Sequence, residues 1–300
     1  RSGVDVTQAV KQIKKYAHEG IFSHGIFSLV QIFVAMTPEK TLYFANTGKS
    51  ENFSPSYYFH WEDFNNAEMF DWKRIGANLL SIPMAHQMVG YYTIADDKDE
   101  TLKVLRSYQY FATTKIWERV HDTKWDDHYH KGGYIWHTTG SGKTMTSFKA
   151  AQLIGKSKEA DKVVLLLDRI ELSTQSADEY RGFANADDNV LDTEDTRKLI
   201  TALESDDKSD YLIVTSIQKM SRITTEHNVP ESTINHINNK RVVFIVDECH
   251  RSVKGKGGEN GSGMLLTIKN TFPRAVLFGF TGTPIFEENA NGEMTTEVIF

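Results

Sequence analysis

Residues 133–144 read Gly-Tyr-Ile-Trp-His-Thr-Thr-Gly-Ser-Gly-Lys-Thr, and this stretch decides the fold. Its apolar start predicts a strand, its glycines predict a turn, and Lys143 opens a helical stretch that reaches about Ile154. Glycines in such a turn let backbone N–H groups point inward and hold phosphate oxygens, while the amino end of the helix adds partial positive charge. The pattern predicts an α/β fold with a nucleotide site at the end of the strand.

The side chains of this turn have separate expected roles. Lys143 supplies a cation for the β and γ phosphates of ATP, and the Thr144 hydroxyl is a ligand for Mg²⁺. His137 stands where the generic pattern has its first glycine. The turn is expected to surround the phosphates through Thr139, Gly140, Ser141 and Gly142.

Further strands follow in the same part of the chain. Apolar runs lie at Val163–Asp168, Leu212–Thr215, Val242–Val246 and Val276–Thr281, with helical stretches between them. Strands that alternate with helices predict a parallel sheet with right-handed crossovers, and short apolar runs predict that both sheet faces are covered. Residues from about 101 to 300 are therefore expected to form one α/β domain.

An acidic pair, Asp247 and Glu248, directly follows the strand Val242–Val246. Carboxylates at the end of a buried strand are costly to desolvate unless they serve a cation or a proton. We expect Asp247 to hold Mg²⁺ and Glu248 to polarise the water that attacks the γ phosphate. Taken alone, the pair also fits a helix cap.

The last strand ends in the turn Thr281-Gly282-Thr283-Pro284. The short hydroxyls of Thr281 and Thr283 can hydrogen-bond the acidic pair or a nucleic-acid backbone. In isolation the stretch indicates only a turn.

Composition is that of an ordinary globular protein. Of the 300 residues, 40% are hydrophobic and 25% are charged, and no apolar run approaches the ~18 residues of a membrane span. The single cysteine, Cys249, excludes an internal disulfide and indicates a reducing, cytoplasmic setting without a membrane partner. The net charge of −6 argues against a globally basic nucleic-acid coat but allows DNA binding in a local groove.

The first hundred residues show a different pattern. An apolar stripe predicts a helix that ends near Gly20, with Gln12 and Tyr16 as a row along its edge. Phe27–Ala35 and Thr41–Ala45 are predicted to be two strands joined by a turn.

The end of this segment is less regular. Ala77–Gln87 is a weaker helical stretch, and the charge run Ala95–Glu100 is interpreted as a solvated linker. We therefore expect a domain boundary near residue 100.

The order of the motifs resembles that of superfamily-two helicases and translocases. Lys143, the acidic pair and the two threonines of the last turn fall where this family has its first three motifs. Leu105–Gln109 resembles the family's adenine-reading Q element, with Gln109 as the base contact. Asp168–Gln175 and Thr215–Lys219 resemble its DNA-contacting motifs. The resemblance implies DNA or coupling roles for Arg169, Gln175, Thr215, Gln218 and Lys219.

Residues 133–144 and 243–252 resemble more narrowly the restriction (HsdR) subunit of type I restriction-modification enzymes, and the departure at His137 is part of that likeness. Gln12 and Tyr16 match the family's Gln-x-x-x-Tyr motif beside the nuclease centre. The resemblance implies ATP-dependent translocation of double-stranded DNA coupled to cleavage of unmodified DNA. It also implies separate methylation and specificity subunits as partners.

In this family the chain would hold parts of two domains. Residues 1–100 would complete a restriction-endonuclease-like (PD-(D/E)xK) domain, and residues 101–300 would form the first RecA-like motor lobe. The nuclease carboxylates would lie before Arg1, and a second lobe with an arginine finger would lie beyond the other end. Two alternatives stay open: a superfamily-two helicase or remodeller without a nuclease, and a nucleotide-switched DNA-binding module that does not turn ATP over.

Overall fold

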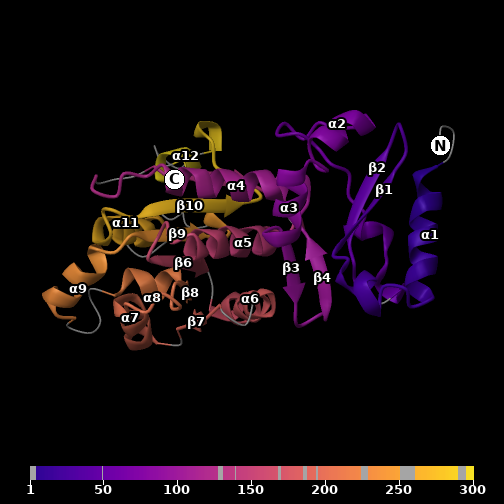
Figure 1. Ribbon diagram of the computed structural model, residues 1–300. Coiled ribbons are helices and arrows are strands. Elements are labelled where there is room, and N and C mark those ends of the chain that lie inside the picture. Colours follow the sequence, from indigo (N-terminus) through magenta and orange to yellow (C-terminus); the bar gives the residue numbers. More distant parts are fainter. Residues whose placement is uncertain are drawn as a thin grey trace. The chain divides into compact units, whose positions relative to one another are not determined.

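The computed structural model divides into two compact units, Arg1–Ala112 (unit 1) and Thr113–Phe300 (unit 2), whose elements are labelled in Figure 1. Helix α4 (Ser107–His121) contains the division. The residues that the structure describes are 5–48, 50–127, 131–138, 140–167, 170–184, 188–193, 195–223, 229–250, 261–289 and 295–300.

Unit 2 is built on a six-stranded sheet in the order β5-β10-β9-β6-β8-β7. Every neighbouring pair is parallel, so the carboxyl ends of all six strands lie at one edge. The predicted parallel α/β sheet is confirmed, while β7 was not foreseen. The strands are β5 (Gly133–Trp136), β6 (Lys162–Leu167), β7 (Val190–Asp192), β8 (Leu212–Ser216), β9 (Val242–Val246) and β10 (Val276–Thr281).

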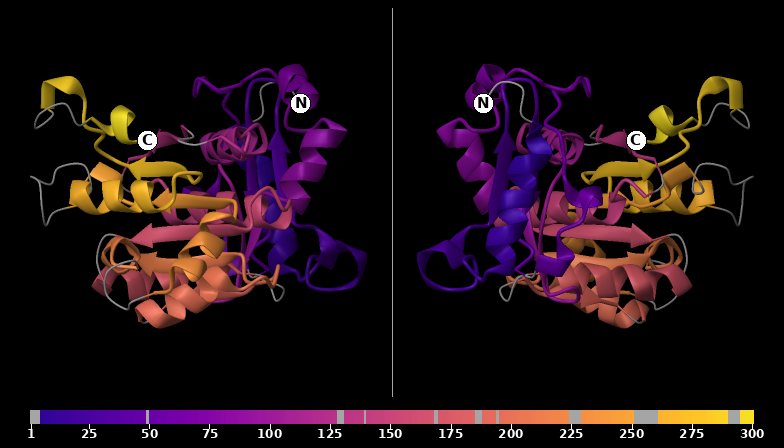
Figure 2. Two further views of the ribbon diagram at one scale, coloured as in Figure 1. Left: turned by 90° about the vertical axis from the view of Figure 1, so that its left-hand side faces the viewer. Right: turned by 90° about the vertical axis from the view of Figure 1, so that its right-hand side faces the viewer.

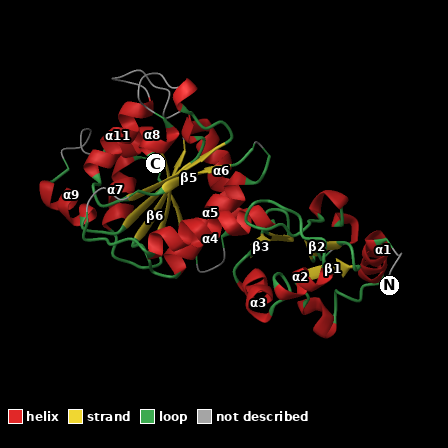
Figure 3. Ribbon diagram, turned by 90° about the horizontal axis from the view of Figure 1, so that it is seen from above, coloured by secondary structure: helices red, strands yellow, loops and turns green. Residues whose placement is uncertain are grey.

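Helices cover both faces of this sheet, as Figure 3 shows. Two pack on one face, α5 (Lys143–Lys156) and α6 (Ile170–Phe183). The other face carries α7 (Thr196–Glu204), α8 (Ile217–Ser221), α9 (Glu231–Asn238) and α11 (Gly261–Thr271). Strands β6, β8, β9 and β10 are buried at every position, which explains their unbroken apolar runs.

The chain ends beyond the sheet. Figure 2 shows, in yellow, the segment after β10, which contains η4 (Glu287–Asn289) and α12 (Thr296–Ile299). Helix α12 contacts β5, and Ile299 is buried with the core. Within the described residues, none of the helices is both long enough and apolar enough to cross a membrane.

Unit 1 has its own core, in which helix α1 (Val6–His18) packs on the antiparallel pair β1 (Ile32–Met36) and β2 (Thr41–Ala45). The predicted helix is confirmed, and so is the second strand. The prediction of a strand from Phe27 was wrong, because a 3-10 helix, η1 (Gly25–Leu29), occupies that stretch. The apolar side chains of this stretch are exposed to solvent, Leu29 by 75%. They do not pack against the core, so the apolar run here does not mark a buried strand.

The predicted helix Ala77–Gln87 is really the end of one helix and most of another. Helix α2 (Trp72–Ala77) ends where the Asn78 side chain donates to the Arg74 carbonyl at 2.9 Å. Helix α3 (Ile82–Gly90) starts afresh with Pro83 in its first turn, where a missing N–H costs nothing. Two further short 3-10 helices lie earlier in this unit, η2 (Ser50–Asn52) and η3 (Pro55–Tyr57).

The charge run at 95–100 is not a linker, and that prediction was wrong. It forms the turn of a hairpin between β3 (Thr93–Asp96) and β4 (Thr101–Val104). The buried carboxylate of Asp96 accepts from the backbone N–H groups of Lys98 and Asp99 at 3.0 and 3.3 Å. Lys103 pairs with both Asp96 and Asp99. A run of charges is thus ordered because its members neutralise one another.

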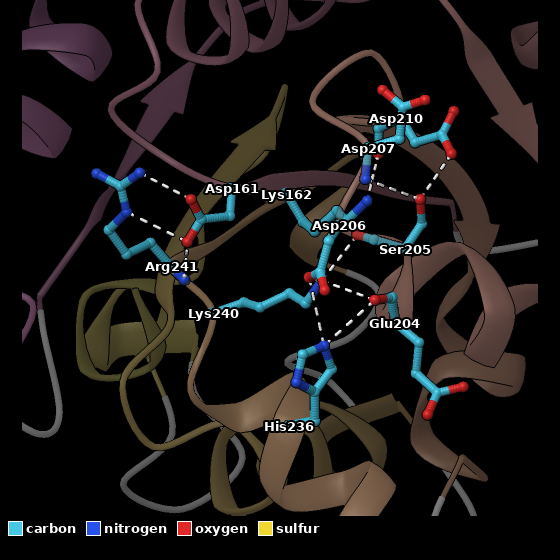
Figure 4. A network of polar contacts seen from close by, with 10 residues as sticks. All are labelled: Asp161, Lys162, Glu204, Ser205, Asp206, Asp207, Asp210, His236, Lys240 and Arg241. Atoms are coloured by element: carbon cyan, nitrogen blue, oxygen red, sulfur yellow. Dashed lines mark hydrogen bonds and ion pairs between the residues drawn. The ribbon is translucent and has the colours of Figure 1, made fainter.

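A polar network holds the amino ends of the strands in unit 2 (Figure 4). The Lys240 ammonium donates to the Glu204 and Ser205 carbonyls at 2.8 and 2.7 Å, where a cation stabilises the end of helix α7. Arg241 pairs with Asp161 through two nitrogens, at 2.7 and 3.2 Å. These contacts fix the sheet edge opposite to the strand ends that carry the motifs.

Gly155, near the end of helix α5, allows a close approach between this helix and Tyr211. A Cβ atom added at Gly155 would lie 2.0 Å from the Tyr211 ring. Tyr211 is 5% exposed and its hydroxyl donates to the Asp188 carboxylate at 2.6 Å, so the ring is held in place.

We expect Gly155→Ala to destabilise unit 2 by about 1–3 kcal/mol, because the added methyl clashes with the Tyr211 ring and displaces it from its hydrogen bond to Asp188. Gly76→Ala is the matched control, since it also lies in a helix and a Cβ there meets nothing within 4 Å. That change should raise stability by about 0.5–1 kcal/mol. Urea unfolding measures both, and equal effects of the two substitutions would contradict the packing argument.

Candidate functional site

Three neighbouring strands bring the sequence motifs together. Strand β10 lies between β5 and β9, so the glycine turn, the Thr281 turn and the acidic pair all follow strand ends at one sheet edge. The His137 N–H donates to the Thr281 carbonyl at 2.9 Å, which joins the first turn to the second. The Trp136 indole donates to the Gly282 carbonyl at 3.1 Å and strengthens the same junction.

The glycine turn has the backbone that phosphate binding requires. Gly140 and Gly142 have φ of 78° and 80°, a region that favours glycine. Gly142 is the N-cap of α5, and the Ser141 hydroxyl closes the turn by donating to the Thr138 carbonyl at 2.7 Å. The first N–H groups of a fourteen-residue helix are therefore presented at the turn.

The acidic pair meets the lysine of the turn. The Lys143 ammonium lies 3.1 Å from a Glu248 carboxylate oxygen. Glu248 has a φ of 45°, a strained conformation that is frequent at functional sites. The prediction that these distant residues share one site is thus supported by a direct contact.

Asp247 lies beside this pair in a half-buried position. Its carboxylate accepts from the Glu248 N–H at 2.9 Å, and its own N–H donates to the Leu166 carbonyl at 3.0 Å. Burial raises the pKa of Asp247, because the charged form loses hydration. A nearby cation would stabilise the carboxylate, and Lys143 already does so in part.

The donor set fits Mg²⁺ that arrives with a nucleotide. Thr144 lies in the first turn of α5 and Asp247 at the end of β9, which offers one hydroxyl and one carboxylate. Among the described residues, no group of three or more His, Cys, Asp or Glu side chains could hold a metal ion. A nucleotide-borne Mg²⁺ does not need such a group, because phosphates and water complete its coordination.

His250 was missed as a site residue. Its Nδ1 lies 2.9 Å from the Thr281 hydroxyl and 3.4 Å from a Glu248 carboxylate oxygen. The Thr281 hydroxyl also accepts from the Thr283 N–H at 3.1 Å. His250 therefore joins the acidic pair to the Thr281 turn. The available signal was its position two residues after Glu248, but the contact itself depends on β9 and β10 being neighbours.

Cys249 and His137, which lie beside the motifs, are both buried. Cys249 is fully buried, and burial raises the pKa of its thiol, which rules out a thiolate nucleophile at neutral pH. A Cβ added at Gly279 would lie 2.7 Å from the Cys249 sulfur, so these residues pack in direct contact. His137 is 6% exposed, and burial together with Lys143 lowers its pKa to about 4.

For three of the predicted site residues the structure does not describe a side chain. Thr139 and Arg169 lie outside the described residues. Gln175 belongs to α6, but its side chain lies outside them as well. Their expected roles remain predictions.

The candidates near β8 have mixed environments. Thr215 is 2% exposed within the strand, and Gln218 and Lys219 follow it in α8. The Lys219 ammonium donates to the Thr193 carbonyl at 2.7 Å. Their DNA and coupling roles also remain predictions.

Three further candidates lie in unit 1. Gln109 is buried in α4, where its side-chain oxygen accepts from the Arg106 N–H at 2.9 Å and so closes the start of the helix. Gln12 and Tyr16 lie one turn apart on α1, and both are exposed, Tyr16 by 39%. They are thus not used in packing the helix, which leaves them accessible to a ligand.

Comparisons with known proteins point in one direction. Residues 108–300 match the family model described as SWI2/SNF2 ATPase. A type I restriction enzyme endonuclease subunit from Staphylococcus aureus (strain COL) is 35% identical over 301 residues, which cover 100% of this chain and 30% of that protein. The chain thus spans about a third of the length of that relative.

Two further similarities were found. The C-terminal part of a putative type I restriction enzyme endonuclease from Mycoplasma pneumoniae is 39% identical over 159 residues, which cover 52% of this chain and 75% of that protein. The solved SWI2/SNF2 ATPase core of Sulfolobus solfataricus, in complex with dsDNA, has a TM-score of 0.43 and 18% identity, covering 66% of this chain and 34% of that one.

We expect His137→Gln to reduce the loss of stability in acid. The imidazole takes up its proton near pH 6.5 when unfolded and near 4 when folded. Between these values the unfolded state binds more protons, so the free energy of unfolding falls as pH falls, by up to about 1.4 kcal/mol per pH unit. Glutamine does not titrate, so the variant should lose less stability in urea titrations between pH 7 and 5.

His121→Gln is the control with the opposite sign. Glu159 raises the pKa of His121, which favours the folded state at low pH. Removing this imidazole should therefore leave the protein no more acid-resistant than before. Identical pH slopes for the wild type and His137→Gln would show that His137 is not kept neutral by the fold.

Proposed function

The chain belongs to the family of type I restriction enzyme endonuclease subunits, with a SWI2/SNF2 ATPase domain at residues 108–300, and on that premise we propose that it is the motor part of such a subunit. The protein would use ATP and Mg²⁺ to translocate double-stranded DNA, coupled to cleavage of unmodified DNA. Its partners would be methylation and specificity subunits, in the cytoplasm. The observation that carries the proposal is the 3.1 Å pair between Lys143 and Glu248 at the glycine turn.

The chain's own groups suggest an order of events for hydrolysis. A γ phosphate held by the turn competes with Glu248 for the Lys143 ammonium. Once released from Lys143, the Glu248 carboxylate can orient the attacking water and accept its proton. When bound, Mg²⁺ would neutralise charge that develops on the phosphate oxygens, with Thr144 and Asp247 as its protein ligands.

The Thr281 turn would transmit this change to bound DNA. His250 contacts both Glu248 and the Thr281 hydroxyl, so a movement of the Glu248 carboxylate would shift His250 and with it the turn. Thr283 is exposed there and presents a hydroxyl suited to a phosphate backbone. Arg169, Gln175, Thr215, Gln218 and Lys219 would supply further DNA or coupling contacts, as the family resemblance implies.

Unit 1 would complete the nuclease part of the protein. In this proposal residues 1–100 are the end of a PD-(D/E)xK domain, and the exposed row of Gln12 and Tyr16 on α1 orients its active site or its DNA. A helicase or remodeller without a nuclease would share the ATP site but would have no use for this row. A nucleotide-switched binding module would bind ATP without consuming it.

Substitutions at the ATP site separate binding from turnover. Lys143→Ala should weaken ATP binding, because the phosphates lose a cation. Glu248→Gln should retain binding and lose hydrolysis by about 10²–10⁴-fold, the usual contribution of a positioned general base. Nucleotide affinity and ATP turnover with duplex DNA are the measurements, and Glu118→Gln, whose carboxylate pairs with Lys115 on the surface of α4, is the control. Full DNA-dependent function in Glu248→Gln would favour the switch module.

Substitutions on α1 test the nuclease part. In the full-length protein, Gln12→Ala and Tyr16→Ala should abolish DNA cleavage while ATP hydrolysis continues. Gln8→Ala, one turn earlier on the same exposed side, should leave both activities intact. A wild-type protein that hydrolyses ATP on DNA but never cuts it would instead identify a translocase or remodeller.

A further inference from the structure

Asp188 is a buried carboxylate that joins three parts of unit 2. Its side chain is 0% exposed, although it pairs with Lys156 at 3.1 Å. The Gln152 amide donates to one of its oxygens at 2.5 Å and the Tyr211 hydroxyl to the other at 2.6 Å. Gln152 and Lys156 belong to α5, and Tyr211 leads into β8. A carboxylate this deep is tolerated only because it is bonded on both oxygens.

A buried cation completes this cluster. Lys149, also on α5, is 4% exposed and donates to the Gln152 side-chain oxygen at 2.6 Å. Burial and the charge of Lys156 lower the pKa of Lys149 to about 8, and Asp188 opposes that change. Gln152 thus stands between a buried cation and a buried anion. The Gln152 amide, the Tyr211 hydroxyl and Lys156 all share the Asp188 carboxylate, so the cluster depends on that one charge.

Strand β7 follows this cluster directly and is held at both ends. At its amino end, Asn189 donates to the Asp210 carboxylate at 2.7 Å, and the Asp210 carbonyl accepts from Lys162 in the network of Figure 4. At its other end, Thr193 donates to the Val214 carbonyl through its N–H.

Lys219 binds the far end of this strand. Its ammonium donates to the Thr193 carbonyl at 2.7 Å. Strand β7 has three residues and lies at the sheet edge, where it pairs with β8 on one side. A short edge strand held by α5 at one end and by Lys219 at the other can shift as a unit when either end moves.

We propose that Asp188 is a positioning residue that couples the phosphate-binding helix α5 to Lys219 through strand β7. The inference rests on the proposed function, in which α5 holds the phosphates at its amino end and Lys219 belongs to a DNA-contacting motif. Phosphate binding at Lys143 then alters the strand that holds Lys219, and DNA at Lys219 alters α5. Such coupling is reciprocal for binding, so DNA and nucleotide change each other's affinity by the same factor.

A double-mutant cycle on DNA stimulation tests this coupling, because continuity in space does not measure it. The quantity is the ratio of ATP turnover with saturating duplex DNA to turnover without DNA, in the full-length protein. Asp188→Asn keeps the shape of the side chain and removes its charge. Each of Asp188→Asn and Lys219→Met should lower the ratio about tenfold, and the double variant should also stay near tenfold. A loss near a hundredfold, the product of the two, would overturn the coupling.

One further variant serves as a control, and another replaces Asp188→Asn if that variant does not fold. Asp161→Asn breaks the ion pair with Arg241, which also lies at the amino ends of the strands. The Asp161 side chain is not bonded to β7 or to Asp188 in that pair, so this variant should leave the ratio unchanged. If Asp188→Asn does not fold, Tyr211→Phe removes one hydrogen bond to Asp188 and retains the ring against Gly155. It should lower the ratio several-fold alone and add nothing to Lys219→Met; an additive effect would again overturn the inference.

The same experiment separates this inference from the proposed function. A wild-type protein whose ATP turnover does not respond to duplex DNA would overturn the motor proposal and the coupling with it. A wild-type protein that responds, but whose variants multiply their losses, would overturn the coupling through β7 alone.

Discussion

The parallel pairing of β10 between β5 and β9 is the constraint on which the site depends. It places three strand ends side by side. The hydrogen bond from the His137 N–H to the Thr281 carbonyl fixes how far the end of β5 lies along β10. Without this order the Lys143 turn and Glu248, 105 positions apart in the numbering (248 − 143), would not share an ion pair. Chemistry at this edge is thus a consequence of strand order rather than of any single motif.

Charged residues at the amino ends of the strands and those at the carboxyl ends lie in different environments. At the amino edge, the Lys240 ammonium bonds two carbonyls and the Asp206 carboxylate, so its three N–H groups are all used (Figure 4). At the carboxyl edge, Lys143 pairs with a Glu248 that is held in a strained conformation, and burial raises the pKa of Asp247. Charges of the first kind stabilise the fold, whereas those of the second kind would be stabilised further by the nucleotide of the proposed function.

The parts that the sequence predicted are those whose physics is local. Buried strands covered on both faces must be apolar throughout, and a phosphate turn needs glycines, so both are visible as patterns. The hairpin at 93–104 was not visible, because its order comes from Lys103 reaching back to Asp96. The contact between His250 and Thr281 depends on strand order, which no local pattern contains. Gly155 is informative only once Tyr211 is known to lie against it.

In the proposed function, the ion pair between Lys143 and Glu248 would link affinity to catalysis. While the ammonium is paired with the Glu248 carboxylate, the turn has lost part of its attraction for phosphate. A nucleotide phosphate that displaces Glu248 from Lys143 would therefore both complete its own binding site and release the carboxylate proposed as the base. A nucleoside diphosphate would give Lys143 less negative charge than a triphosphate would, so it would compete less well with Glu248. Hydrolysis would then restore the pair and favour product release, which gives the cycle a direction from electrostatics alone.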